Sequence, residues 1–423
     1  MMISQNGGTD MANARKVGLS LSYNGSNLKS LKKDCVESFI FMDIASGESD
    51  SIEITLDNTS FRFMKNDKPC KGDKIGATIQ LHNWNKTGQT LPCKCGRFVL
   101  DDLSFSDPPC ICEIGAVAMP VKGEFKGRNR KKTYKNVTVK EIAKTISKRA
   151  GVELHYSAKR IHIKEIEQST VPDSDFLMSL CEEYGLGLKV FRGKIVIFDE
   201  EEYEKKKPIR TINRKEDVIN WSWNTTLQGT YTGAKVTYTD SDDNKKHHIT
   251  IGKKGRMLDV NVTAFSKRDA ELKAKAKLAE ENKKRTTMTL EIFPDPRIVA
   301  ASTICLKGFY KLSGKYYVQK VTHRITGKGT YSMSLDVYKV TNRIGVESTS
   351  NANSGSGGTA VYEVTRGDSL EMIAKKYFGN MKYRDMVYQQ NKSVIEAAAK
   401  KAGHSSSKNG KILIRGTKLK ITT

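Results

Sequence analysis

Residues 137–151 read VTVKEIAKTISKRAG, and this stretch predicts the helix around which the rest of the chain is organised. Thr138 and Glu141 have the spacing of a capping box, in which each side chain bonds the backbone N–H of the other residue. The apolar residues that follow recur at helical spacing, at Val139, Ile142, Ala143 and Ile146. Gly151 stands where a left-handed C-cap is needed. One amphipathic helix is therefore expected here.

A second helix is predicted from Asp173 or Ser174 up to Gly185. Its apolar stripe consists of Phe176, Leu177, Leu180, Cys181 and Tyr184. Two strand-like runs follow directly, over residues 186–191 and 194–198, and they meet at a short turn that contains glycine. Because β-rich sequence lies on both sides, an α/β unit inserted between two β arms explains the chain better than a row of independent domains.

Length and composition set the scale of the fold. The 423 residues suggest three or four units of roughly 100–150 residues each. The hydrophobic content of 38% is enough for globular cores, and no run approaches the roughly 18 apolar residues of a membrane span. The N-terminal residues also lack the basic and apolar regions of a secretion signal.

The net charge of +25 indicates anionic surroundings: nucleic acid, lipid headgroups, cell-wall polymers or an acidic protein surface. The basic residues are spread along the chain, however, and the densest cluster is the short stretch 126–132. A solvated basic loop explains that cluster better than a nucleic-acid site does. Nucleic acid is therefore not expected as a specific ligand.

The eight cysteines include two close pairs, Cys93 with Cys95 and Cys110 with Cys112. Residues two apart on a strand share a face, so a hairpin could bring four thiolates together. Zinc sites more often use two intervening residues between cysteines, which makes these pairs poor chelates. Reduced thiols that pack as small apolar side chains are expected instead, with no metal and no cofactor.

β-rich sequence forms an arm on each side of the central unit. Residues 15–120 show about six short strand-like runs, and residues 206–345 show a similar set interrupted by a charged helix over 266–282. Each arm is predicted to close a β-barrel. The predicted fold class is α+β: an N-terminal extension (1–14), two barrels, and an α/β insertion (121–205) between them.

The C-terminal part of the chain forms a separate module. Residues 346–360 are rich in glycine and serine and predict a flexible linker, and residues 361–423 predict the order β-α-α-β. This segment resembles a LysM domain at Tyr362, Val364, Gly367, Asp368, Ser369, Leu370, Ile373, Ala374, Tyr377, Gly379, Asn391, Gly416, Leu419 and Ile421.

The LysM resemblance implies binding of peptidoglycan glycan in a shallow groove between two loops. Carried over by position, the binding residues would be Gly367, Asp368, Ser369, Leu370, Asn391 and Ile414. Two features depart from the family pattern: Arg415 replaces the usual proline, and residues 396–411 are an insertion beside the groove. Glycan binding and protein docking both remain open for this module.

Residues 15 to about 345 resemble the baseplate hub proteins of contractile phage tails, the late-control-D family, which is related to the base of type VI spike proteins. The stretches that carry the resemblance are residues 14–15, 23–25, 41–50, 69–73, 96–98, 106–109, 174–176, 182–185, 314–316 and His323. The resemblance implies a homotrimer in which two barrel domains per subunit form a pseudo-sixfold ring.

That ring would join a hexameric tail tube to a trimeric spike. The partners implied are further copies of the chain, the tail spike protein, the tail tube and other baseplate proteins, with the tape measure protein as a further candidate. The implied location is the tail baseplate of a virion, or of another contractile injection system, assembled in the bacterial cytoplasm. No enzyme activity is expected.

A peptidoglycan hydrolase targeted by the LysM module is the alternative. Such chemistry needs a paired acid and base, an activated nucleophile or a zinc site. The seven histidines are scattered, and none stands in a zinc-protease or nucleophile motif. We therefore expect a structural hub with no catalytic residues.

Overall fold

The computed structural model describes residues 14–24, 26–27, 35–65, 68–84, 86–118, 124–226, 230–240, 245–327, 329–340, 359–365, 368–378 and 381–422. The chain divides into two compact units, residues 1–348 and 349–423, and each is described by itself. Nearly all of the predicted N-terminal extension and of the predicted glycine-serine linker lies outside the described residues. Within the described part, no helix is both long and apolar enough to cross a membrane.

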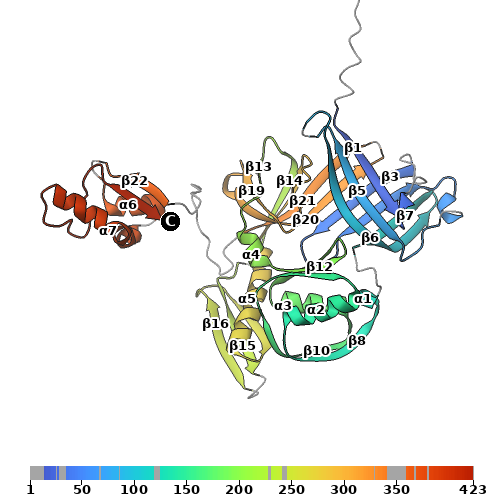
Figure 1. Cartoon of the computed structure of the whole chain (residues 1–423), viewed down its shortest axis with the longest axis horizontal. Coiled ribbons are helices and arrows are strands. Elements are labelled where there is room, and N and C mark those ends of the chain that lie inside the picture. Colours follow the sequence, from blue (N-terminus) through green and yellow to red (C-terminus); the bar gives the residue numbers. More distant parts are fainter. Residues whose placement is uncertain are drawn as a thin grey trace, which may run out of the picture. The chain divides into compact units, whose positions relative to one another are not determined.

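Thirteen strands of the first unit form one sheet, in the order β14-β18-β21-β20-β3-β4-β7-β6-β5-β1-β2, with β19 paired to β20 and β13 paired to β19 (Figure 1). The strands of the first arm are β1 (Lys16–Tyr23), β2 (Ser26–Asn27), β3 (Val36–Ile44), β4 (Ser51–Asp57), β5 (Lys74–His82), β6 (Thr90–Ser106) and β7 (Ile111–Val117). Those of the second arm are β13 (Arg210–Asn213), β14 (Val218–Thr225), β18 (Thr286–Ile292), β19 (Thr303–Lys307), β20 (Gly314–Thr326) and β21 (Tyr331–Lys339).

This sheet corrects the prediction of two separate closed barrels. The two arms are joined where β20 pairs with β3, in a register that runs from Lys320 opposite Ile44 to Thr326 opposite Ser38. Among the described strands the path does not close on itself and ends at β14 and β2. The physical reason is the length of β20, whose 13 residues pair with β19 at one end and with β3 at the other, along its whole length beside β21.

The sheet buries one hydrophobic core in each arm. Alternate residues of its strands point inward, as the burial pattern of β3 illustrates. The core of the first arm includes Phe39, Ile54, Leu81, Phe98 and Leu100. The core of the second arm includes Leu290, Ile304, Tyr316, Val321 and Leu335. Each arm therefore has its own interior even though their backbones share one sheet.

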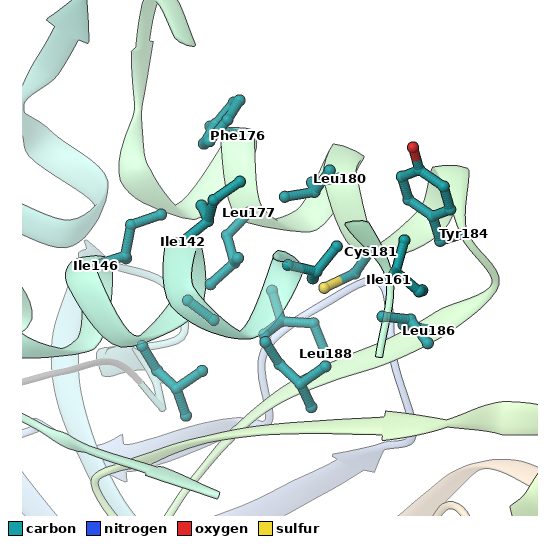
Figure 2. Close-up of a cluster of buried hydrophobic side chains, with 14 of the residues drawn as sticks. Ile142, Ile146, Ile161, Phe176, Leu177, Leu180, Cys181, Tyr184, Leu186 and Leu188 are labelled. Carbon is teal, nitrogen blue, oxygen red and sulfur yellow. The ribbon is translucent and has the colours of Figure 1, made fainter. Parts of the chain in front are cut away.

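The two helices and the two following strands that the sequence predicts for the central α/β unit are present, and the structure adds further elements. Its elements are α1 (Glu124–Gly127), β8 (Asn129–Thr138), α2 (Val139–Ala150), β9 (Glu153–Ser157), β10 (His162–Pro172), α3 (Asp173–Glu183), β11 (Leu186–Phe191), β12 (Lys194–Asp199) and α4 (Glu200–Lys205). Figure 2 shows Ile142 and Ile146 of α2 facing Leu177 of α3, with Leu188 of β11 close by. The capping box at Thr138 and the left-handed Gly151 are both present.

We expect Thr138→Ala to lower the free energy of unfolding by about 1 kcal/mol, because it removes a helix N-cap. The Thr138 hydroxyl accepts the backbone N–H of Glu141 at 3.3 Å, and the Glu141 carboxylate accepts the Thr138 N–H at 2.7 Å. Urea unfolding of the full chain, followed by circular dichroism, measures the change. Thr145→Ala is the matched control, since that hydroxyl only donates to the Glu141 carbonyl within the same helix. An equal loss in both variants would contradict this account.

Residues 233–283 form a small unit of their own rather than part of a second barrel. Strands β15 (Gly233–Asp240), β16 (Lys246–Gly252) and β17 (Met257–Ala264) make a separate sheet in the order β16-β15-β17. Helix α5 (Lys267–Lys283) covers it and buries Ala274 and Leu278 against Val236 and Val260. The predicted helix at 266–282 is thus present, but it needs this sheet to bury its alanine stripe.

The second unit has the predicted order β-α-α-β. Strands β22 (Thr359–Glu363) and β23 (Lys418–Thr422) pair antiparallel, with α6 (Leu370–Phe378), the short 3-10 helix η5 (Met381–Tyr383) and α7 (Arg384–Lys401) between them. Its core contains Leu370, Ile373, Val387, Ile395 and Leu419. The first six residues of the predicted insertion, 396–401, continue α7, so this part of the insertion is helical.

Candidate interaction surfaces

A buried ionic cluster joins the central unit to the first arm. Lys189 of β11 pairs with Asp43 at the end of β3 and lies 2.9 Å from Asp50, just before β4. The same ammonium donates to the Ile44 carbonyl at 2.9 Å. Asp43 also accepts the backbone N–H of Ala300, so the second arm takes part as well. We call Asp43, Asp50 and Lys189 the Lys189 junction.

The Lys189 junction is almost dry, and this shapes its charges. Side chains of Asp50 and Lys189 are 1% and 11% exposed. Burial raises the pKa of Asp50 to about 7, although Lys189 opposes the rise. Burial by itself would lower the pKa of Lys189, but its two carboxylate neighbours outweigh this and raise it. The lysine is therefore held charged, and it ties three parts of the unit together.

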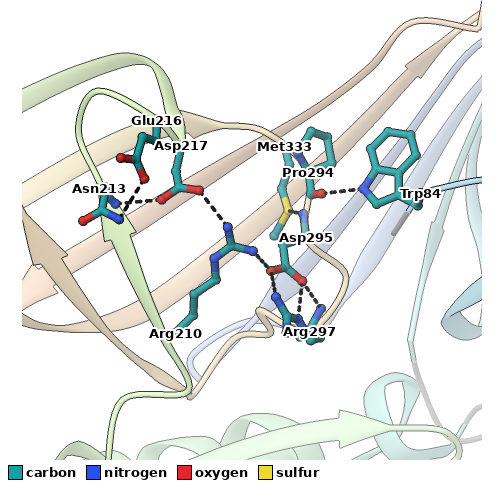
Figure 3. Close-up of polar contacts among 9 residues, drawn as sticks. All are labelled: Trp84, Arg210, Asn213, Glu216, Asp217, Pro294, Asp295, Arg297 and Met333. Atoms are coloured by element: carbon teal, nitrogen blue, oxygen red, sulfur yellow. Dashed lines mark hydrogen bonds and ion pairs between the residues drawn. The ribbon is translucent and has the colours of Figure 1, made fainter. Parts of the chain in front are cut away.

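A second polar cluster links the two arms (Figure 3). The Trp84 indole N–H, from the turn after β5, donates to the Pro294 carbonyl of the second arm at 2.8 Å. Next to Pro294, the buried carboxylate of Asp295 accepts from Arg210, and from Arg297 at 2.7 and 2.9 Å. Arg210 also bonds Asp217 at 2.7 Å. The loop after β18 is thus fixed to the first arm.

The strand β14, at one end of the large sheet, exposes bulky apolar side chains. Ile219, Trp221 and Trp223 are 54%, 39% and 38% exposed. Trp221 packs edge-on against the Phe309 ring at a centroid distance of 5.5 Å, which holds it in place. Among the described strands, β14 pairs only with β18. An open strand edge that carries two tryptophans is typical of an interaction surface.

Two of the histidines, His323 and His82, take structural positions. His323 is buried between the rings of Phe41 and Tyr331, and burial lowers its pKa to about 4. Its Nδ1 lies 2.7 Å from the Tyr331 hydroxyl. His82 bonds the Thr90 hydroxyl at 2.9 Å. No group of three His, Cys, Asp or Glu side chains in the described part is arranged to hold a metal ion.

The two cysteine pairs lie at different positions along the β6–β7 hairpin and are not opposite each other. Cys93 lies opposite Ile79 of β5, whereas Cys112 of β7 lies opposite Phe105 of β6. Cys93 and Phe105 are thus twelve positions apart along β6, and register shifts interrupt the pairing of β6 with both neighbours. The hairpin therefore does not bring Cys93, Cys95, Cys110 and Cys112 together, and all four are free thiols.

The residues of the first candidate glycan loop mainly form contacts within the second unit. Gly367 lies outside the described residues. The Asp368 carboxylate accepts from the Tyr362 hydroxyl and from the Thr365 N–H, both at 2.7 Å. Ser369 accepts the Met372 N–H at the start of α6, and Leu370 is fully buried. Of these, Asp368 and Ser369 are partly exposed.

The other two candidates are Asn391 of α7 and Ile414, which lies in the segment between α7 and β23. Asn391 is 2% exposed, donates to the Val387 and Lys420 carbonyls and accepts the Lys420 N–H at 2.6 Å. It therefore fastens α7 to β23. The Ile414 carbonyl accepts from both the N–H and the hydroxyl of Thr417. Ile414 itself is half-buried.

Glu396 organises the loop that follows α7. Its carboxylate accepts from the side chain and the backbone N–H of Ser407, and from the Tyr388 hydroxyl at 2.7 Å. These hydrogen bonds lower its pKa to about 2. Gly410 follows in the same loop at φ +75°, and a Cβ there would lie 2.2 Å from the Leu370 side chain. The glycine thus lets the loop approach the core.

We expect Glu396→Gln to loosen this loop at neutral pH, because the charged acceptor is lost. The folded pKa lies below the ordinary value of 4.5, so its contribution is present above pH 4.5 and is lost as the pH falls through about 2. Hydrogen exchange of residues 384–422 in the full chain measures the effect at about pH 7 and about pH 3. The difference from the unmodified chain should shrink at the lower pH.

Asp385→Asn is the matched control, because that carboxylate is 80% exposed and only pairs with the neighbouring Arg384. Faster exchange is expected in Glu396→Gln alone. Equal exchange in both variants, or a difference that does not depend on pH, would contradict the role of Glu396.

The sequence of this chain is similar to one family model and to one curated relative. Residues 188–338 match the family model described as YQBQ-like. A curated relative, described as a probable baseplate hub protein of Escherichia phage 186, is 27% identical over 255 residues, which cover 58% of this chain. The match spans 62% of the length of that relative.

Two solved structures share the fold. A tail protein from Neisseria meningitidis MC58 aligns with a TM-score of 0.58, and a 43 kDa tail protein of prophage MuSo2 from Shewanella oneidensis aligns with 0.55. Each alignment covers 77% of this chain and 97% of the other, at 10% identity. At such low identity the likeness concerns the fold.

Proposed function

We propose that this chain, which has the fold of phage tail proteins and is similar in sequence to a probable baseplate hub protein, is a structural hub of a contractile tail baseplate. Three copies would form a ring that joins the tail tube to the spike. The hub performs no chemistry. It would be located in the tail of a virion or tail-like particle, and its partners would be other tail and baseplate proteins.

The observation that carries this proposal is the single sheet with two open ends. At one end, among the strands that the structure describes, β14 pairs only with β18, and it exposes its tryptophans. At the other end, within the described residues, β2 covers β1 only at Ser22 and Tyr23. Unlike edges at the two ends favour head-to-tail contacts, and such contacts close into a ring when the rotation between copies permits it.

The buried clusters support a scaffold rather than an enzyme. The Lys189 junction fixes the central unit to both arms, and the Trp84 contact fixes the arms to each other. A hub that transmits force needs this kind of rigidity between its parts. The first unit, which carries the tail-protein fold, would thus move as one body.

The C-terminal unit would be a LysM-like module that binds peptidoglycan or docks another protein. The partly exposed Asp368 and Ser369 support glycan contact through the first loop. Exposed methionines on its helices, Met372, Met381 and Met386, at 55%, 50% and 39%, support protein docking instead. Sedimentation of the full chain with purified peptidoglycan decides between the two.

The central test is the molar mass of the full chain in solution, alone and mixed with a candidate spike protein. A trimer that forms a defined complex with the spike is the expected result. Peptidoglycan release by the chain would point to the hydrolase alternative. A chain that stays monomeric at all concentrations and does not bind the spike would overturn the hub proposal.

A further inference from the structure

A groove of about 860 Å³ runs through the first unit between α3 of the central unit and α5 of the small unit. Figure 1 shows α5 standing between β15 and the helices of the central unit. Strand β17 lines the groove along its length, and Ile166 and Glu167 of β10 contribute to its lining. We call it the β17 groove. The proposed contacts between copies, through β14 and β1, do not involve this groove.

The groove exposes the open edge of β17. In the three-stranded sheet β15 is central, so β17 has a partner on one side only among the described strands. Five consecutive residues of β17, from Leu258 to Val262, line the groove. Successive side chains of a strand point to opposite faces, so a run of five lining residues means that the backbone edge itself faces the groove. Such an edge accepts another strand.

The lining of the groove is negatively charged, whereas the chain as a whole is positively charged. Its lining contains seven carboxylates against three lysines, a net charge of −4, in a chain of +25. The carboxylates are Glu167, Glu182, Glu183, Glu200, Asp259, Glu280 and Glu281. Two of the three lysines are already paired, Lys273 with Glu183 at 2.8 Å and Lys283 with Glu200 at 2.6 Å. A ligand would therefore meet a negative surface.

The walls of the groove are held in place before any ligand arrives. At the start of α5, Asp269 accepts the Tyr184 hydroxyl of the central unit at 2.8 Å. At its end, Lys283 bonds Glu200 of α4 at 2.6 Å. Because α5 is fastened at both ends, little conformational entropy remains to be lost on binding.

We propose that β17 accepts an extended, lysine- and arginine-rich segment of a partner protein, which adds to the sheet as a fourth strand. Backbone hydrogen bonds to β17 hold the segment, and its basic side chains lie against Asp259 and Glu182 across the groove. Neither of these two carboxylates takes part in an ion pair found in the described residues, and both side chains are exposed. An acidic ligand would lack the attraction to these carboxylates, and a compact ligand would lack the backbone hydrogen bonds to β17.

The test uses a fluorescein-labelled heptapeptide that alternates lysine with threonine, and anisotropy with the full chain at low salt. Two changes separate backbone pairing from charge. N-methylation of alternate residues keeps the charge but removes N–H donors, and a peptide that alternates glutamate with threonine keeps the backbone but reverses the charge. Each change is expected to weaken binding at least tenfold. Equal binding of the N-methylated peptide would overturn strand addition.

Variants of the chain locate the site. Asp259→Lys and Glu182→Lys are each expected to weaken binding of the lysine peptide about tenfold. Asp101→Lys, an exposed change in the first arm outside the groove, is the matched control and should bind like the unmodified chain. Equal weakening in all three would mean non-specific attraction and would overturn the proposal.

The same samples separate a partner protein from a second copy. If another copy of the chain filled the groove, the peptide would compete with it and lower the molar mass of the oligomer, which would overturn the proposal of a separate partner. Unchanged molar mass with bound peptide is expected. Peptide binding and trimer formation are measured separately. The proposal for the groove and the hub proposal can therefore fail independently.

Discussion

Lys189→Ala is expected to lower the free energy of unfolding of the first unit by about 3–5 kcal/mol, the largest loss we predict for a single substitution. Removing the lysine leaves Asp43 and Asp50 close together and buried, at 6% and 1% exposure, with no cation between them. Neither carboxylate can be rehydrated without opening the contact between the central unit and the first arm. Urea unfolding of the full chain measures the loss.

Lys194→Ala is the matched control, because Lys194 begins β12, the partner strand of β11. Its ion pair with Glu153 has a length of 2.6 Å, but the two side chains are 48% and 65% exposed. Exposed pairs contribute little, so a loss of about 1 kcal/mol or less is expected. A loss below about 1 kcal/mol in Lys189→Ala as well would refute the importance of the junction.

The pH dependence gives a second readout for the same junction. The folded pKa of Asp50, about 7, exceeds its ordinary value of 3.8. Protonation of this carboxyl therefore stabilises the fold fully below pH 3.8, and the stabilisation is lost as the pH rises through about 7. Lys189 holds the pKa of Asp50 down, so in the variant Asp50 keeps its proton to higher pH in the folded state. The free energy of unfolding should therefore fall more steeply between about pH 6 and about pH 8 in the variant than in the unmodified chain.

Local signals predicted the central unit well because they act over a few residues. The capping box at Thr138, the apolar stripe of α2 and the C-cap at Gly151 lie within one helix, and each is present in the structure. The order β-α-α-β of the C-terminal unit follows from the same kind of signal. Periodicity and caps determine what an element is.

Periodicity does not say which strands become neighbours, and the predicted barrels failed for this reason. The pairing of β20 with β3 joins residues about 280 positions apart. Likewise, a lysine in the apolar run of β11 was visible in the sequence, but its partner Asp43 lies 146 residues away. A lysine inside a strand that is otherwise apolar is the signal that could have marked the junction.

The sequence also left open what the candidate site residues do. The LysM pattern selects Leu370 and Asn391, which are buried in the structure and hold the module together. Asp368 and Ser369 combine structural hydrogen bonds with partial exposure. A family pattern records residues that keep the fold as well as those that bind, so spacing alone cannot separate the two.

Replacing both tryptophans of β14, in Trp221→Ser/Trp223→Ser, is expected to abolish assembly of the proposed trimer. The two side chains lie on the same face of an edge strand, and large aromatic anchors at an interface typically contribute 2 kcal/mol or more, about 30-fold in affinity each. Sedimentation equilibrium over a range of concentrations measures the association, and circular dichroism checks that the monomer still folds.

The fold should survive this change, because both tryptophans are more than a third exposed and, within the described residues, only Trp221 packs on another ring, that of Phe309. Phe61→Ser is the matched control: its ring is 40% exposed, but it follows β4 in the middle of the sheet, away from either open end. That variant should associate like the unmodified chain. A double variant that still forms trimers with unchanged affinity would mean that the copies do not meet through β14, and the head-to-tail ring would have to be rebuilt on another edge.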